Sequence, residues 1–442
     1  MPIQKSSGAA GGLIDRLLST VIDVRPGEAP ALAWSWLYFF SILSAYYVIR
    51  PIRDEIGAAG GIENLPWLFT GTLAGMLIAN PPFGALVARL APVRFISWTY
   101  RFFIANLVLF LVVLETTSGP ANVWAGRLFY VWAAIFNLFV VSVFWGFLAD
   151  VFSSEQSRRL FGFIAAGGTI GGIAGSTLTS VLVEHLGRTR LLLVSAVLLE
   201  AAVWSVRRLA RIARGLRERS RSGEDDTAVG GGMLSGFAHA VRSPYLLSIT
   251  LYMLLFTILS TFLYFQQADL ARHSFTDRSA RTAFFARIDL AVNILTLLVQ
   301  LFLTSRIIKG LGVALTLGLL PALSIAGFAV VGFAATLWAV VAFQVLRRAG
   351  NFAVARPTRE TCFTVLPRED KYKAKSFIDT FVYRAGDQIG AWSYAGMAFL
   401  GLGLAGISLG AALISVGWLV NGLSLGRRNE SLARRAAAPE AG

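Results

Sequence analysis

Long apolar runs recur along almost the whole chain, and they constrain its fold more than any other feature. Each run holds about 20 residues with few charges, which is the length at which an α-helix crosses the core of a bilayer. Lipid offers no hydrogen bonds to the backbone, so such runs must be helical. Twelve runs are predicted, at about 31–52, 64–88, 94–114, 122–149, 159–183, 189–206, 244–268, 283–305, 311–333, 336–357, 376–399 and 403–423.

The composition also indicates a membrane protein. Hydrophobic residues make up 55% of the 442 residues and charged residues only 15%, whereas soluble domains carry about 25% charged residues. Cys362 is the single cysteine and the three histidines lie far apart, so we expect no disulfide and no metal site. The sequence has no nucleophile elbow, zinc motif or Walker pair. We therefore expect neither enzyme activity nor a cofactor.

The net charge of +15 lies mostly in short loops between the apolar runs. This distribution follows the positive-inside rule and argues against nucleic-acid binding. The loops after the second, fourth, sixth, eighth and tenth runs are the basic ones, and the segment 50–63 is an exception. We therefore expect both termini and the central linker on the cytoplasmic side of a bacterial inner membrane.

The runs divide into two sets of six around a polar segment. We predict a cytoplasmic amino terminus with an amphipathic helix at 1–28, a six-helix bundle at 29–206 and a linker at 207–243. A second six-helix bundle at 244–425 and a cytoplasmic tail at 426–442 follow. This is an all-α membrane fold of about twelve spans like that of the major facilitator superfamily, which has a site at the midplane between its halves. A shift of 214 residues supports an internal repeat, because it places Leu37-Tyr38 on Leu251-Tyr252 and Phe163-Ile164 on Phe377-Ile378.

Charged side chains inside a span are costly, and they mark either a functional pathway or a paired structural site. The first run ends with Arg50, Arg53 and Asp54. If the helix continues past Pro51, Arg50 and Asp54 form an i,i+4 pair and Arg53 faces elsewhere. An unpaired arginine there would suit an anionic ligand, and an ordinary external loop with salt bridges is the alternative.

The tenth run ends with Arg356, Arg359 and Glu360. The spacing predicts a bridge from Arg356 to Glu360, which leaves Arg359 as the free cation. An ordinary basic helix end on the cytoplasmic side is the alternative.

The eleventh run is the richest in charge. Arg384 and Asp387 share a helix face with Gln388, and Asp379 and Tyr383 are four residues apart. Lys375 leads into this run. We favour a role in lining a cavity over a purely structural network.

Other polar positions are weaker candidates, because a single polar group in a span is more often a contact between helices than a ligand contact. They are Asp289, Asn293 and Gln300 on one stripe of the eighth run, Gln266 and Gln267 in the seventh, and Asn137 in the fourth. Gly167, Gly171 and Gly175 form a smooth stripe, which predicts close helix packing and not a phosphate loop, since no Gly-Lys-Ser/Thr ending follows.

Several segments resemble the ATP/ADP-exchange translocases of plastids and obligate intracellular bacteria, and more closely their relatives in free-living bacteria. The segments are 46–54, 143–150, 158–168, 356–360 and 371–379, with Arg384 and Gly386 following. The resemblance implies a facilitator-like fold of twelve spans that exchanges nucleotides through membrane-embedded charged residues. It aligns two lysines of the family with Arg53 and Lys375. In the same alignment, one acidic residue of the family corresponds to Gln266 or Gln267 of this chain. Another acidic residue of the family has no match, with Ala133 or Asn137 near its place.

We therefore predict a secondary transporter that exchanges nucleotides or other phosphorylated anions and acts as a monomer in the bilayer. Arginine binds phosphate or carboxylate in a bidentate manner, so an anionic substrate fits the change from lysine. Two alternatives remain, a proton-coupled facilitator for an unrelated solute and a membrane protein that transports nothing. The predicted substrate-binding residues are Arg50, Arg53, Arg356, Arg359, Lys375 and Arg384. The coupling or ion-pair candidates are Asp54, Glu360, Asp379, Asp387 and Asp289.

Overall fold

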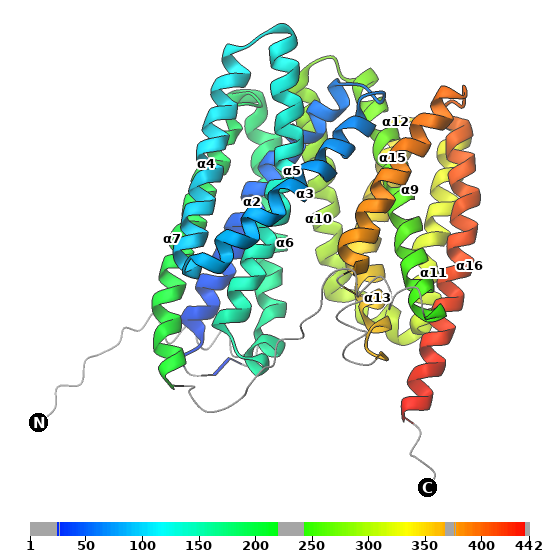
Figure 1. Ribbon diagram of the computed structural model, residues 1–442. Coiled ribbons are helices and arrows are strands. Elements are labelled where there is room, and N and C mark those ends of the chain that lie inside the picture. Colours follow the sequence, from blue (N-terminus) through cyan, green and yellow to red (C-terminus); the bar gives the residue numbers. More distant parts are fainter. Residues whose placement is uncertain (1–23, 26, 220–242, 367–374, 376, 438–442) are drawn as a thin grey trace, which may run out of the picture. The chain divides into compact units, whose positions relative to one another are not determined.

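The computed structural model describes residues 24–25, 27–219, 243–366, 375 and 377–437. These residues form helices and connecting loops, without strands (Figure 1). The amphipathic helix expected within 1–28 lies almost entirely outside the described residues, as does most of the segment 371–379 ahead of Lys375.

Each of the twelve predicted runs lies on a helical segment of the described residues, so the all-α membrane fold is confirmed. Eight of these helices are long and apolar enough to cross a membrane by themselves. The first six segments are α2 (Ala29–Ala59), α3 (Leu65–Arg89), α4 (Pro92–Thr116), α5 (Gly119–Val151), α6 (Ser154–Leu186) and α7 (Leu191–Arg219). The remaining ones are α9 (Pro244–Ser274), α10 (Arg278–Phe302), α11 (Thr304–Phe333), α12 (Leu337–Gly350), η1 (Asn351–Ala355), α13 (Arg356–Cys362), η2 (Ile378–Val382), α15 (Tyr383–Phe399) and α16 (Leu404–Ala437).

Two basic segments that the sequence places in loops are helical in the structure. Helix α7 continues to Arg219, so the first part of the segment 207–243 extends the sixth span. Arg306 and Lys309 lie in the first turns of α11, ahead of a kink at Gly312. Gly312 has a φ of 72°, a backbone conformation that a residue without a Cβ adopts readily, so the chain turns there without an ordinary loop.

The described residues form two compact units. The first comprises those within Met1–Arg53 and Gly75–Glu224, and the second those within Asp54–Ala74 and Asp225–Gly442. The last turns of α2 and the first turns of α3 therefore belong to the second unit. Helices α2 and α3 each contribute residues to both units.

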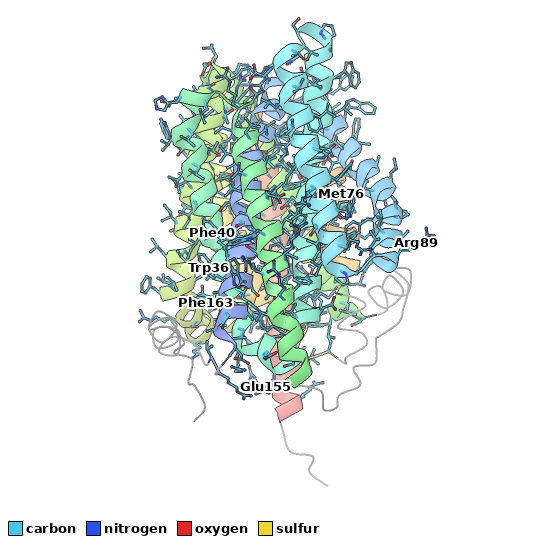
Figure 2. The ribbon with its side chains drawn as sticks, turned by 90° about the vertical axis from the view of Figure 1, so that its left-hand side faces the viewer. Trp36, Phe40, Met76, Arg89, Glu155 and Phe163 are labelled. Atoms are coloured by element: carbon cyan, nitrogen blue, oxygen red, sulfur yellow. The ribbon has the colours of Figure 1, made fainter. Side chains whose placement is uncertain are left out.

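In the first unit, α6 packs closely on α2 through its glycine stripe. A Cβ on Gly171 would meet the carbonyl oxygen of Phe40, and a Cβ on Gly175 would meet that of Ser44. The hydroxyl of Ser44 donates to the carbonyl oxygen of Gly171 at 3.0 Å. Figure 2 shows Trp36 and Phe40 following one another along α2. The predicted role of the stripe in helix packing is confirmed.

In the second unit, α15 packs on α9 in a comparable way. Cβ atoms on Gly386 and Gly390 would meet Thr257 and the backbone of Ile258. Helices α11 and α16 also lie side by side (Figure 1), and a Cβ on Gly426 would meet the backbone of Ala314. Small residues let helix backbones approach in this manner in membrane proteins.

Two short π-helical segments interrupt the helices of the second unit. Segment η1 joins α12 to α13 and ends directly before Arg356, and η2 contains Asp379 and leads into α15. A π-helical turn carries i→i+5 hydrogen bonds and changes the direction of the side chains that follow. Such turns are frequent at functional sites.

Candidate functional site

The charged residues around η1 and η2 form an ion-pair network within the second unit. The guanidinium of Arg359 lies 3.4 Å from the carboxylate of Asp379 and 4.0 Å from that of Glu360. Lys375 forms a salt bridge with Glu360. The structure thus brings together four of the residues that the sequence singled out. We call Arg356, Arg359, Glu360, Lys375 and Asp379 the π-segment cluster.

Two details of the sequence prediction for this region are wrong. Arg359 is not the free cation, because it pairs with Asp379, and Glu360 is bridged by Lys375. Arg356 lies exposed at the start of α13. The prediction considered partners within one helix only, whereas the partners come from the chain that leads into the next span.

Burial distinguishes the members of this cluster. The side chain of Arg359 is only 7% exposed, while those of Asp379, Glu360 and Lys375 are between 35% and 38% exposed. A buried guanidinium is therefore held against carboxylates that remain accessible. An anion that replaced one of these carboxylates would find a cation already placed in the protein interior.

Arg384 and Asp387 lie one helical turn apart in α15. Their side chains form the predicted i,i+3 pair at 3.1 Å. Gln388 follows, and its side-chain oxygen accepts a hydrogen bond from the hydroxyl of Thr70 at 3.0 Å. Tyr383 stacks beside Arg384, with 5.6 Å between the guanidinium and the ring.

A second charged cluster joins the end of α2 to α9 and α10. Glu55 is fully buried and lies 3.0 Å from Arg278 and 3.7 Å from Arg281. Asp54 accepts a hydrogen bond from the hydroxyl of Tyr264 at 3.2 Å. Sequence reasoning named Asp54 but missed Glu55 and both arginines. A local signal existed, because an acid adjacent to Asp54 in a continuous helix is also a buried charge that needs a partner.

A third charged group lies between α10 and α12. Asp289 is 1% exposed and its carboxylate lies 2.7 Å from Arg348. The side chain of Asn293 donates to the backbone oxygen of Asp289, and that of Gln300 donates weakly to the backbone oxygen of Phe352. Asp289 is therefore part of an ion pair and Asn293 stabilises its own helix.

Arg347 is the most deeply buried of the arginines that the sequence reasoning missed among the described residues. It is 2% exposed and donates to the hydroxyls of Ser324 and Ser260 and to the carbonyl oxygen of Phe256. Its guanidinium also lies over the rings of Phe256 and Trp418. The pair Arg347-Arg348 within the apolar run 336–357 was the available signal. The contacts indicate that Arg347 joins α12 to α9, α11 and α16.

The remaining predicted residues are dispersed. In the first unit, the guanidinium of Arg50 lies 5.8 Å from the ring of Tyr47 and that of Arg53 lies 5.2 Å from the ring of Tyr130. Rings hold arginine in this way through cation–π attraction. Asn137 is half-buried in α5. In the second unit, Gln266 donates to the hydroxyl of Ser408 at 2.8 Å, and Gln267 is buried beside it in α9.

Solved structures with a similar arrangement are membrane transporters. A POT family transporter in complex with 5-aminolevulinic acid has a TM-score of 0.61 at 9% identity, covering 90% of this chain and 96% of that one. The POT family transporter PepTSo has a TM-score of 0.59 at 13% identity, covering 91% and 98%. A bacterial metal transporter has a TM-score of 0.55 at 14% identity, covering 90% and 99%. The chain is therefore a multi-pass membrane protein with the major facilitator-like fold that the sequence predicts.

The sequence itself is similar to that of ADP,ATP carrier protein 1 of Chlamydia pneumoniae. The two are 20% identical over 450 residues, which cover 86% of this chain and 87% of the carrier. No family model matches the chain. The similarity agrees with the resemblance that the motifs indicate, and it spans both halves of the protein.

Proposed function

We propose that the protein is a secondary transporter that exchanges nucleotides or other phosphorylated anions across the membrane by alternating access. Its fold is shared with membrane transporters, and the similar carrier protein is named for ADP and ATP. The π-segment cluster is the observation that carries the substrate class. Among the described residues it holds Arg359 and Lys375 in ion pairs with Asp379 and Glu360, and Arg356 adds a third basic residue that attracts the carboxylate of Asp379.

The cluster offers a way to bind an anion without leaving a buried charge unpaired. Removing one partner of a buried ion pair is costly, on the order of 3–5 kcal/mol, so Arg359 needs a counter-charge in every state. In the absence of substrate, Asp379 and Glu360 supply it. A phosphate group would take their place, because arginine forms short, bidentate hydrogen bonds with phosphate oxygens.

This substitution also accounts for exchange. A carrier whose cations are satisfied by substrate can return across the membrane when it is loaded, so one anion moves in as another moves out. Arg384 extends the basic character along α15 and is balanced by Asp387. Arg50 and Arg53, which the sequence predicts as substrate-binding residues, lie beside tyrosine rings within the first unit.

The test is uptake of labelled ATP and ADP into proteoliposomes that are either empty or preloaded with unlabelled nucleotide. We expect uptake that preloading stimulates at least tenfold and that inorganic phosphate at equal concentration does not match. Uptake that follows an imposed pH gradient and does not respond to preloading would instead identify a proton-coupled facilitator.

We also propose that the protein lies in a bacterial inner membrane with both termini in the cytoplasm. The support is that basic residues gather after every second span along the chain, in the segments 89–94, 158–159, 207–219 and 306–309. Reporter fusions at Met1 and Gly442 test this arrangement. Both should be active only with a cytoplasmic reporter, and a periplasmic signal from either end would contradict it.

A further inference from the structure

The first unit contains a groove outside every charged cluster described above. It lies where the start of α4 meets the end of α5 and the last part of α7, and its volume is about 960 Å³. Its walls are mostly apolar and include Pro92, Val93, Trp98, Phe147, Val151 and Ala210.

The groove is also basic. Four arginines line it, Arg94 on α4, Arg101 on α4, and Arg207 and Arg211 on α7, against a single acid, Asp150. Arg101 is balanced by Glu200 at 2.8 Å. Arg207 uses one of its five N–H donors on the hydroxyl of Ser97, at 3.4 Å. The groove therefore combines apolar walls with a surplus of positive charge, and a ligand with both an apolar part and an anionic part would complement it.

The position of the groove along α7 is consistent with the boundary of a bilayer. Helix α7 begins at Leu191, so Arg211 lies about 30 Å along the helix at 1.5 Å per residue. This distance equals the thickness of a typical hydrocarbon core, about 30 Å. With Leu191 at one boundary of the bilayer, the groove would lie at the headgroups of the other, at the end of the first unit's spans that carries the basic segments 89–94 and 207–219.

The helix faces beside the groove are of the kind that lipid covers. Trp98 and Phe102 on α4 are 71% and 63% exposed, and Val197 on α7 is 71% exposed. Trp204 is 48% exposed and carries Arg208 over its ring. Exposed tryptophans with arginines beside them are typical of the interface between lipid and water.

We propose that this groove binds the headgroup of an anionic phospholipid, with the acyl chains lying along the exposed apolar faces of α4 and α7. Arg94, Arg207 and Arg211 pair with the phosphate and the headgroup charge, and Trp98 with Pro92 contacts the glycerol end of the chains. Basic pockets between spans bind anionic headgroups by this combination of forces.

The experiment is native mass spectrometry of the detergent-solubilised protein titrated with phosphatidylglycerol or phosphatidylcholine of identical chains. The wild-type chain should bind phosphatidylglycerol in clear preference. The double variant Arg94→Ala/Arg211→Ala should weaken that binding about 25-fold, from about fivefold for each arginine near a surface. Both residues are exposed, so the variant should fold.

Two further variants make the test specific. Arg208→Ala removes the same charge from the same helix but not from the groove, so its affinity should stay within twofold of the wild type. Asp150→Asn removes the one acid of the groove and should strengthen phosphatidylglycerol binding several-fold.

Three results would overturn the proposal. The first is equal affinity for the two lipids, and the second is an equal loss in Arg208→Ala. The third is displacement of phosphatidylglycerol by millimolar inorganic phosphate, which would make the groove a site for a soluble anion. The measurement does not involve transport, so its result tests the lipid site independently of the proposed nucleotide exchange.

Discussion

The crossing of α6 over α2 in the first unit and the crossing of α15 over α9 in the second unit use the same packing device with different chemistry. In both, glycines of the later helix rest on the backbone or small side chains of the earlier one, at Gly171 and Gly175 in one case and at Gly386 and Gly390 in the other. At the first crossing the glycines meet uncharged residues and the charges of α6 lie toward its ends, whereas α15 carries Arg384 and Asp387 beside Gly386, and the η2 segment before it carries Asp379.

This difference separates packing from function. Close approach of the helices needs glycine and is achieved in the first unit without any charge at the crossing. Both crossings have these close glycine contacts, so the charges beside Gly386 need an explanation other than close approach. Charges in a membrane are costly and mark either a functional pathway or a paired structural site, and the proposed anion transport assigns these charges to the pathway.

The largest effect should come from Gly171→Ala. The added Cβ would overlap the carbonyl oxygen of Phe40 and lie 3.0 Å from its Cα, and backbone atoms of a packed helix cannot move aside. We expect destabilisation of about 3 kcal/mol or more, at the upper end of overpacking effects. Thermal unfolding in detergent measures it. Gly162→Ala on the same helix meets open space and should be neutral or slightly stabilising. Equal unfolding temperatures for the two variants would show that the crossing does not depend on glycine.

Gly386→Ala should have a smaller effect on stability, about 1–3 kcal/mol. Its Cβ would collide mainly with the side chain of Thr257, which can be shortened, unlike a backbone oxygen. The double variant Gly386→Ala/Thr257→Ala removes the clashing hydroxyl but keeps the Cβ of residue 257 at 2.8 Å, so it should recover part of the lost stability. Gly396→Ala, which meets nothing within 4 Å, is the control. Failure of the double variant to recover any stability would mean that the hydroxyl of Thr257 does not limit the approach of the two helices.

A smaller effect on stability should come from Glu28, where the start of α2 meets the first turns of α6. Glu28, just before α2, lies 3.0 Å from Arg159 of α6 and accepts a hydrogen bond from Gln156 at 2.8 Å. Burial opposes its charge, but the hydrogen bonds from Arg159, the Arg25 backbone and Gln156 outweigh burial and lower the pKa of Glu28 below its usual 4.5. A lowered pKa stabilises the fold above about pH 4.5, and that stabilisation is lost as the pH falls through the folded value.

Glu28→Gln should therefore lower the unfolding temperature near neutral pH and reduce its decline at acid pH. The expected change is about 1 kcal/mol, the net contribution of one typical hydrogen bond, because the amide of glutamine keeps part of the network. Glu184→Gln, an exposed acid at the other end of α6, should keep the decline of the wild type. If the unfolding temperature of Glu28→Gln declines at acid pH as steeply as that of the wild type, Glu28 is not the group responsible for the decline.

The sequence supported the fold well because hydrophobic runs and glycine stripes are local signals. All twelve runs lie on helical segments, and the stripe at Gly167, Gly171 and Gly175 does pack on another helix. The sequence does not predict which helix the stripe packs on, because periodicity defines a helix face but not the partner of that face.

The charged pairs also differ in how far the sequence predicts them: pairs within one helix follow from spacing, and pairs between segments do not. The Arg384–Asp387 pair was predictable from its i,i+3 spacing. The pairs Arg359–Asp379 and Asp289–Arg348 join different segments, and no spacing rule connects them. The segments η1 and η2 were also unforeseen, because a π-helical turn has no simple sequence signature and arises from the packing around it.

The central claim is that the π-segment cluster binds the transported anion and does not merely staple two helices. The exchanged pair Arg359→Asp/Asp379→Arg tests it most directly, because it keeps one positive and one negative charge in contact but moves the buried cation to the more exposed position. The measurement is preload-stimulated ATP uptake into proteoliposomes, and thermal unfolding checks that the variant folds. Arg427→Gln, at an exposed arginine of α16, is the control. We expect a folded protein whose exchange falls more than tenfold, while the control exchanges at the wild-type rate. Full exchange by the swapped variant would show that the pair is structural and would contradict the account.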